Sequence, residues 1–335
     1  MAPMIFSTIL SAEMTNWIGK LLLLLSDAIG NFGVTVIVFS ILLKVLMSPI
    51  DVWQRVSMNK QQKSMAIMQP KLEKLQKQYA NRPDVLKQKQ MELQKDSHIN
   101  VLASCLPMVV SMVVFFVVFA GFRALIVYEN QVILENLNNI YTANFGKVTA
   151  DELNALLANA YQPQSFLWIK NIFMSDIGVN VIPDLKGFTS NGFGGVGAIV
   201  PEGLNATYQE LVGPAMAKYN KQSFWDAARW NGYFVLPLFA IGTSFLSTKI
   251  MQKSQPQTQT GTKEQQQKQQ STMKYMNYLM PLMLGFFAIM YSAAFAIYYV
   301  MSNVLSTLMS VMLNVIIKKV DANKEKKLLA DPTRR

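Results

Sequence analysis

The chain has 335 residues, of which 51% are hydrophobic and 15% are charged, and its formal net charge is +11. Soluble domains carry about 25% charged residues, so the composition argues against a purely soluble protein and favours membrane-spanning segments. The single cysteine excludes an internal disulfide and a multi-thiolate metal site, and the single histidine, His98, excludes a His-rich metal centre. The sequence contains no HExxH, GxSxG or GxxxxGK[ST] motif. We therefore expect a protein that is not an enzyme and has no cofactor and no metal.

The N-terminal residues 1–30 are predicted to lie outside the cytoplasm and to include a helix in the membrane interface. The stretch from Trp17 to Ile29 is apolar, but it is short and contains Lys20 and Asp27. A signal peptide is the alternative, but no Lys or Arg precedes Lys20, no small-residue cleavage site is evident, and a second apolar segment follows at once. We favour an interfacial helix that leads into the first span.

Uncharged stretches then predict five transmembrane helices, and the predicted fold class is an all-α integral membrane protein. The predicted spans lie within residues 31–50, 101–122, 232–248 and 275–317, which carry no charge except Lys44. The last of these ranges has 43 residues, about twice what one span needs, so it predicts spans four and five with a turn near Tyr291 and Ser292.

Lys and Arg residues are concentrated in three of the segments outside these spans. Residues 51–100, 249–274 and 318–335 together hold 22 of them, whereas 123–231 holds seven basic and nine acidic residues. Basic residues are retained on the cytoplasmic side, so we expect the N-terminus outside and a basic C-terminal tail in the cytoplasm. The positive charge then follows from topology, and a nucleic-acid partner is not required.

Residues 51–100 are predicted to form a cytoplasmic helical hairpin. Its first arm carries an apolar stripe at helical spacing, made of Met65, Met68, Leu72, Leu75 and Tyr79. The turn contains Pro83, and Leu86 and Leu93 resume the stripe on the second arm. Pro70 lies inside the first arm, where it is predicted to kink or break the helix. A solvated basic pair of helices with a structural role only is the alternative interpretation.

Two connections are less regular. Residues 249–274 are predicted to be a cytoplasmic linker, since 252–271 is rich in Gln and Thr. The extracytoplasmic segment 123–231 leaves two alternatives open, a soluble mini-domain or a set of surface helices lying on the membrane. Within it, 151–160 is typical of a helix and the glycine-rich stretch 187–203 is typical of a loop.

Lys44 is the one charged residue inside the predicted spans. A lysine costs about 2.5–3.5 kcal/mol at the bilayer centre on insertion scales. Either Lys44 extends to the cytoplasmic headgroups, or it points into a water-filled cavity that receives an acidic or polar group. Ser40, Lys44 and Ser48 recur every four residues, which makes one face of the first span polar.

Other predicted spans also carry polar stripes, and together they predict a hydrophilic groove open to the cytoplasm and the bilayer. The remaining residues assigned to this groove are Ser104, Ser111, Ser247, Tyr299, Ser302, Asn303 and Ser306. For a single helix, close packing through small hydroxyl residues is the alternative explanation.

The chain resembles the YidC family of bacterial membrane protein insertases in five motifs that keep their order and spacing. These are GNFGVTVIVFSILLKVLMSPIDVWQ (30–54), QPKLEKLQKQY (69–79), HINVLASCLPMVV (98–110), FLWIKNIFMSD (166–176), and MKYMNYLMPLM with AIYYVMSN (273–303). The chain is similar to short, five-span members. It departs from them at Lys44, where the family has an arginine, and in about fifty extra residues before the third span.

The resemblance implies insertion of membrane proteins into the bacterial plasma membrane. The groove would receive hydrophobic segments of nascent membrane proteins, which would leave laterally between spans one and five into the lipids. The hairpin would receive substrate, the C-terminal tail would contact ribosomes, and the Sec translocon would be a further partner. A small-solute transporter or channel subunit that uses the same groove is the alternative, and a membrane anchor whose outer segment carries the function is a third possibility.

Overall fold

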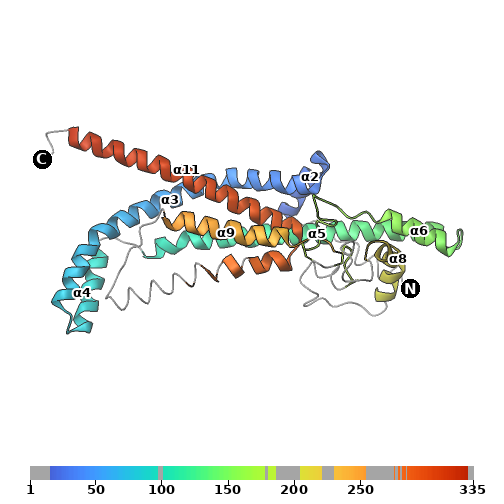
Figure 1. Cartoon of the computed structure of the whole chain (residues 1–335), viewed down its shortest axis with the longest axis horizontal. Coiled ribbons are helices and arrows are strands. Elements are labelled where there is room, and N and C mark those ends of the chain that lie inside the picture. Colours follow the sequence, from blue (N-terminus) through green and yellow to red (C-terminus); the bar gives the residue numbers. More distant parts are fainter. Residues whose placement is uncertain are drawn as a thin grey trace. The chain divides into compact units, whose positions relative to one another are not determined.

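The fold is helical. The computed structural model describes residues 16–96, 101–177, 180–185, 204–220, 230–253, 275, 278–279, 281–283 and 285–330. Over these residues it contains no strand and one isolated bridge between Phe166 and Ile169 (Figure 1). The long helices are α2 (Trp17–Ile29), α3 (Phe32–Gln78), α4 (Pro83–Asp96), α5 (Val101–Asn144), α6 (Ala150–Ala160), α8 (Leu204–Tyr219), α9 (Val235–Lys253) and α11 (Ala293–Ala330). The predicted all-helical class is confirmed for this part of the chain.

Three helical segments are long and apolar enough to cross a membrane, judged by length and composition. They are Phe32–Ser57, Met112–Asn144 and Ala293–Asn323. Two more, Val235–Ile250 and Pro281–Met290, are apolar but shorter. The structure therefore supports a membrane protein with several spans, and the count of five stays a prediction.

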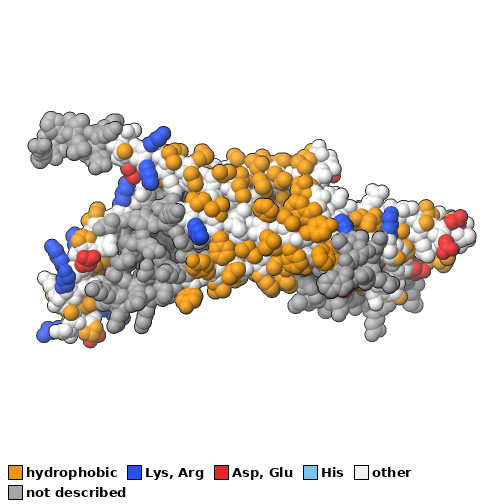
Figure 2. Space-filling model, viewed as in Figure 1, with side chains coloured by type: hydrophobic (Ala, Val, Ile, Leu, Met, Phe, Trp, Pro, Cys, Tyr) orange, Lys and Arg blue, Asp and Glu red, His pale blue; other side chains and the backbone are white. Residues whose placement is uncertain are grey.

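Large hydrophobic side chains are exposed along these helices (Figure 2). On α3, Val45 and Leu46 are 65% and 67% exposed, and on α11 Leu308 and Met312 are 58% and 63% exposed. Soluble proteins seldom expose contiguous apolar surface of this kind, because water penalises it. These faces are therefore suited to contact with lipid.

The chain divides into two compact units. The first unit comprises Met1–Ile41, Val114–Ile241 and Met283–Met301, and the second comprises Leu42–Val113, Gly242–Leu282 and Ser302–Arg335. Several helices contribute residues to both units, so the boundaries between the units fall within helices.

Aromatic rings form much of the core of the first unit. Phe39 of α3 lies 6.0 Å from Phe122 of α5 and 6.2 Å from Tyr298 of α11, measured between ring centroids. Phe122 also meets Phe295 edge-on at 6.0 Å. All four rings are buried. Such pairs contribute about 0.5–1.5 kcal/mol each beyond the area that they bury, so they hold three helices together in this unit.

The predicted helix from Trp17 to Ile29 is confirmed as α2. Its first turn is capped by the side chain of Asn16, which accepts hydrogen bonds from the N–H groups of Ile18 and Gly19 at 3.0 and 3.2 Å. It ends at Gly30, whose φ of 75° is the left-handed conformation that glycine adopts without strain. Its location in the membrane interface stays a prediction.

The first arm of the predicted hairpin is the second half of α3. Helix α3 continues through Pro70 and ends at Gln78, so the alternative of a helix break at Pro70 is wrong. A proline removes one N–H donor and bends a helix, but packing on both sides can keep the helix continuous. Met68 and Leu72, which flank Pro70, are buried at 4% and 5% exposure and supply that packing.

The second arm is α4, which begins at Pro83 after a turn from Tyr79 to Asn81. Proline suits the first helical position because the N–H group there has no partner within the helix. Leu86 is buried, and Leu75 and Tyr79 are half-buried. Lys and Arg side chains gather on α4 and the adjoining arm of α3 (Figure 2). The side chain of Met65 lies outside the described residues.

The segment predicted as 123–231 contains a helical module with its own hydrophobic core. The helix of the second predicted span does not end at 122, since α5 continues to Asn144. The core is formed by Leu134, Leu137, Leu153, Leu157, Tyr161, Ile182, Leu185, Tyr208, Leu211, Val212 and Ala215. Tyr208 donates its O–H to the carbonyl of Pro183 at 2.9 Å, which satisfies a phenol buried in this core. The described residues thus pack around one core, and the choice between a soluble mini-domain and a set of surface helices lying on the membrane stays a prediction.

Some predicted features lie outside the described residues. These are the glycine-rich stretch 187–203, the linker from 254 to 274, His98 and the side chain of Cys105. The predicted turn within 275–317 is confirmed, because a helical segment ends at Met290 and α11 begins at Ala293.

The start of α6 gives a testable local prediction. Thr149 Oγ1 accepts from the N–H of Glu152 at 3.3 Å, and the N–H of Thr149 donates to Glu152 Oε2 at 3.0 Å, which is a capping box. Thr149→Ala should destabilise α6 by about 1 kcal/mol and speed amide hydrogen exchange there. Thr142→Ala is the control, since the Thr142 hydroxyl donates to the carbonyl of Asn138 within a helix and caps nothing. Equal α6 exchange in both variants would contradict the prediction.

The same cap has a pH dependence. Hydrogen bonds from the backbone and side chain of Thr149 lower the pKa of Glu152. A depressed carboxyl pKa means that the cap stabilises the helix above the ordinary pKa of glutamate and loses this effect as the pH falls through the lowered pKa.

Candidate functional site

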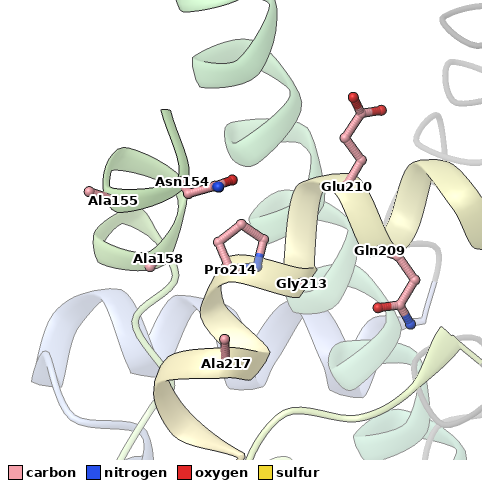
Figure 3. A pocket seen from close by; sticks show the side chains of 8 residues that line it. All are labelled: Asn154, Ala155, Ala158, Gln209, Glu210, Gly213, Pro214 and Ala217. Atoms are coloured by element: carbon pink, nitrogen blue, oxygen red, sulfur yellow. The ribbon is translucent and has the colours of Figure 1, made fainter. Parts of the chain in front are cut away.

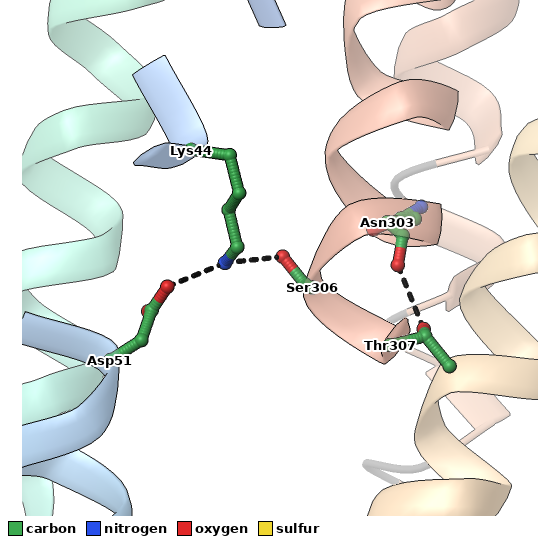
Figure 4. A network of polar contacts seen from close by, with 5 residues as sticks. All are labelled: Lys44, Asp51, Asn303, Ser306 and Thr307. Atoms are coloured by element: carbon green, nitrogen blue, oxygen red, sulfur yellow. Dashed lines mark hydrogen bonds and ion pairs between the residues drawn. The ribbon is translucent and has the colours of Figure 1, made fainter. Parts of the chain in front are cut away.

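Lys44 is held by two polar side chains of the second unit (Figure 4). Its Nζ atom lies 2.7 Å from Oδ2 of Asp51 and donates to Oγ of Ser306 at 2.9 Å. The side chains of Lys44 and Asp51 are 18% and 29% exposed. The ammonium group is therefore in contact with a carboxylate and a hydroxyl, and it is neither fully exposed nor enclosed by hydrocarbon.

The ion pair follows from the geometry of α3. Lys44 and Asp51 are seven residues apart, which is two helical turns and about 10 Å along the axis. Side chains on a helix lean toward its N-terminus, so Asp51 leans toward Lys44, and the long lysine side chain covers the remaining distance. The pair lowers the cost of placing a lysine in an apolar helix, because a paired charge is less costly to bury than an isolated one.

A separate group of polar contacts lies on α11 (Figure 4). Thr307 donates its hydroxyl to the carbonyl of Asn303 at 2.7 Å, and Nδ2 of Asn303 donates to Oγ of Ser244 on α9 at 2.8 Å. Ser244 is buried. The second unit thus contains hydrogen-bonding groups from α3, α9 and α11.

Further along α3, polar residues contact α11 at every turn. Nε and Nη2 of Arg55 both donate to Oδ1 of Asn314, the first at 2.8 Å. Lys63 Nζ lies 2.7 Å from Oδ2 of Asp321, and Asn59 Nδ2 donates to the same oxygen at 3.5 Å. The face of α3 that carries Lys44 therefore stays polar toward the C-terminal part of α11.

The other residues predicted for the groove fall into three groups. Ser48, Ser247 and Ser302 are half-buried in the second unit, as are Asn303 and Ser306. Ser40 and Tyr299 are buried in the first unit, where the hydroxyl of Ser40 donates to the carbonyl of Val36 at 2.7 Å. The side chains of Ser104 and Ser111 lie outside the described residues.

Sequence reasoning missed Asp51 and Arg55. The first predicted span ends at residue 50, so the sequence alone places both residues in the predicted hairpin. Their spacing of seven and eleven from Lys44 places all three on one face of a helix, and this pattern could have identified them. The apolar segment Phe32–Ser57 includes them.

A second group of polar contacts surrounds Asp176 in the first unit. This carboxylate is fully buried. Its Oδ1 accepts from the N–H of Tyr233 at 2.9 Å and from Nε1 of Trp168 at 3.2 Å, and its Oδ2 accepts from the N–H of Leu236 at 2.6 Å. Gly232 packs so closely that an added Cβ would lie 1.8 Å from Oδ1. Asp176 therefore caps the N-terminal end of α9.

The same loop also caps α11. The N–H groups of Ala293 and Ala294 donate to the carbonyls of Met174 and Ile172 at 2.8 and 2.9 Å. These N–H groups have no partner within their own helix, so the loop satisfies them. The FLWIKNIFMSD motif is thus a structural element that fixes the first residues of two helices.

A shallow depression of about 590 Å³ lies between α6 and α8 (Figure 3). Its lining residues are Asn154, Ala155, Ala158, Gln209, Glu210, Gly213, Pro214 and Ala217. Most are small, and Glu210 accepts a hydrogen bond from Tyr141. Within the described ranges no group of three or more His, Cys, Asp and Glu residues is placed to hold a metal ion.

These features define a class of protein, a membrane protein that is helical over its described residues, with several apolar spans and a partly buried cation beside a carboxylate and a hydroxyl. Within that class, the chain belongs to the family described as 60Kd inner membrane protein, whose sequence model matches residues 24–321. The resemblance to the YidC family is thereby confirmed.

Curated relatives are similar to part of the chain. A membrane protein insertase YidC of Fusobacterium nucleatum is 38% identical over 96 residues, which cover 29% of this chain and 45% of the relative. The YidC of Caldanaerobacter subterraneus is 31% identical over 112 residues, covering 33% and 52%. That of Brucella suis is 43% identical over 95 residues, covering 27% and 14%. The chain matches about half of the length of the first two relatives and less of the third.

Proposed function

We propose that this protein is a membrane protein insertase and chaperone of the bacterial plasma membrane. The observation that carries the proposal is the partly exposed ammonium of Lys44, held between Asp51 and Ser306 in otherwise apolar helices. A charge in such a position is costly, and it is usually found where it serves a function. Membership of the family and the printed names of the relatives support the same conclusion.

In the proposed mechanism, a polar segment of a nascent membrane protein enters a hydrophilic groove beside Lys44. The proposed groove residues are Lys44, Ser48, Ser247, Ser302, Asn303 and Ser306 of the second unit, together with Ser104 and Ser111, whose side chains lie outside the described residues. Hydrogen-bonding groups replace part of the water that the segment loses, which lowers the cost of its transfer. The attached apolar helix moves laterally into lipid, where burial of its side chains stabilises it.

The topology belongs to the proposal as well. Five spans would place the N-terminus outside and the basic C-terminal tail in the cytoplasm. The arms of α3 and α4 would then form a cytoplasmic hairpin that receives nascent chains, and their basic surface would suit contact with ribosomes. The Sec translocon is a further proposed partner. Transfer of an acidic tail outward is coupled to the membrane potential by about 2.3 kcal/mol per charge at 100 mV, so no nucleotide is needed.

Reconstitution tests the function directly. Purified full-length protein in proteoliposomes should insert single-span clients with short translocated tails, measured by protease protection of the tail. Empty liposomes are the control. Uptake of small solutes without client insertion would instead support a transporter or channel subunit.

The groove itself can be tested by thiol labelling. In a Cys105→Ser background, Lys44→Cys is expected to react with a membrane-impermeant thiol reagent added from the cytoplasmic side. Val45→Cys is the matched control, because Val45 is 65% exposed on an apolar face that would contact lipid. Protection of Lys44→Cys to the same degree as Val45→Cys would contradict a water-accessible groove.

A further inference from the structure

We infer that Asp51 is an internal competitor for Lys44 and sets which clients the cation accepts. This inference rests on the proposed function and adds a specificity-determining residue to it. A client that brings a carboxylate to Lys44 must replace Oδ2 of Asp51, which lies 2.7 Å from the ammonium nitrogen.

One ammonium group neutralises one carboxylate. If a client carboxylate joined Asp51 at Lys44, a net negative charge would remain among apolar helices, where like charges repel strongly in the low dielectric. Exchange is therefore favoured over simultaneous binding.

The contacts around the Lys44 ammonium group also favour exchange. Lysine binds as a point charge with three N–H donors, one of which is given to Ser306, while Oδ2 of Asp51 is held beside the ammonium as an ion pair. Ser306 contributes a neutral hydroxyl that can stay in place when the carboxylate changes. The Asp51 side chain is 29% exposed, although its Oδ2 atom is buried at the ion pair, so the carboxylate can regain water when it leaves the lysine.

Asp51 competes with client groups for Lys44. Asp51 is attached to the same helix as Lys44, so its effective concentration at the ammonium is at least in the millimolar range typical of short tethers. A weakly acidic or neutral tail gains little from displacing it. Asp51 therefore raises the threshold for occupying Lys44, and its removal should favour acidic clients.

A second ion pair provides a matched comparison. Lys63 and Asp321 lie at the same 2.7 Å, but their side chains are 55% and 37% exposed and the pair joins two helices. Exposed pairs of this kind are hydrated, and they have little effect on burial of a client charge. We therefore expect Asp51 to compete with a client carboxylate and Asp321 not to compete.

The test on the unaltered protein uses a carbodiimide, which couples a carboxylate to a nearby amine. Full-length protein in proteoliposomes should give a Lys44–Asp51 amide and a Lys63–Asp321 amide, both detected by mass spectrometry. A single-span client with a Glu in its tail should lower the yield of the Lys44–Asp51 amide by about twofold, and the matched Gln client should not. The estimate assumes competition at comparable effective concentrations. The Lys63–Asp321 amide should be unchanged by either client.

The variant test measures selectivity. Asp51→Asn should raise the ratio of Glu-client to Gln-client insertion by about fivefold to tenfold, which corresponds to the upper part of the range for a typical net hydrogen bond. Asp321→Asn should leave that ratio unchanged. An unchanged ratio in Asp51→Asn, or a Lys44–Asp51 amide yield that is insensitive to the Glu client, would overturn the inference. If Asp51→Asn does not fold, the amide yield in the unaltered protein still decides. Failure of the unaltered protein to insert either client would instead contradict the proposed function.

Discussion

Lys44→Glu is expected to reduce client insertion about 100-fold, whereas Lys44→Arg should keep it within about threefold of the unaltered protein. Glutamate would place a second carboxylate beside Asp51, where no cation neutralises either one. A buried, unpaired charge in an apolar helix costs about 2.5–3.5 kcal/mol, which corresponds to a factor of about 100. Arginine keeps the charge and has enough donors to contact both Asp51 and Ser306.

The measurement is protease protection of a single-span client in proteoliposomes that contain equal amounts of each variant. Lys63→Glu is the control, because it reverses a charge on the same helix at a side chain that is 55% exposed. Exposed ion pairs contribute about 0–1 kcal/mol, so Lys63→Glu should retain most of the activity. Full activity of Lys44→Glu would show that no positive charge is needed at this position.

The polar helix face around Lys44 could be predicted from the sequence, because the helical period places Ser40, Lys44 and Ser48 on one face. The partner of Lys44 on α3 could not be predicted once the span was bounded by the end of the uncharged stretch. A helix does not end where hydropathy falls, since its backbone hydrogen bonds form equally well beyond the membrane. For the same reason α3 continues to Gln78 and α5 to Asn144.

The helical module of the first unit illustrates a second limit of sequence reasoning. Its core joins Leu137 of α5, Leu157 of α6 and Tyr208 of α8, which are far apart in the chain. The local pattern of each helix indicates an apolar face but not which other face covers it, because pairing depends on long-range packing. Residues 151–160 could therefore be predicted as a helix, while the packed module could not.

The role of the FLWIKNIFMSD motif became clear only from its hydrogen bonds. In the sequence it is a mixed stretch without helical period, and the resemblance alone singles it out. In the structure its carbonyls and Asp176 take up N–H groups at the starts of α9 and α11. Its polar residues are thus explained by helix capping within the first unit.

Asp176→Ala is accordingly expected to destabilise the protein more than any substitution of an exposed acidic residue. The change removes the acceptors of two backbone N–H groups and one indole N–H in a fully buried position. A buried donor left without a partner costs about 1–3 kcal/mol. Because the hydrogen bonds from Tyr233 and Trp168 are only part-buried, the three together should cost about 3–5 kcal/mol, the lower part of the summed range. At roughly 2–4 °C per kcal/mol, the apparent melting temperature in detergent should fall by about 10 °C.

The matched control is Asp151→Ala in the first turn of α6, where the carboxylate is exposed and interacts with the helix dipole only. That change should cost at most about 1 kcal/mol. The two sites can also be told apart by their readouts, since Lys44→Glu should lose insertion with a smaller change in melting temperature. Asp176→Ala should lose insertion only to the extent that the protein unfolds at the assay temperature. A melting temperature of Asp176→Ala equal to that of Asp151→Ala would mean that the loop does not hold α9 in place through this carboxylate.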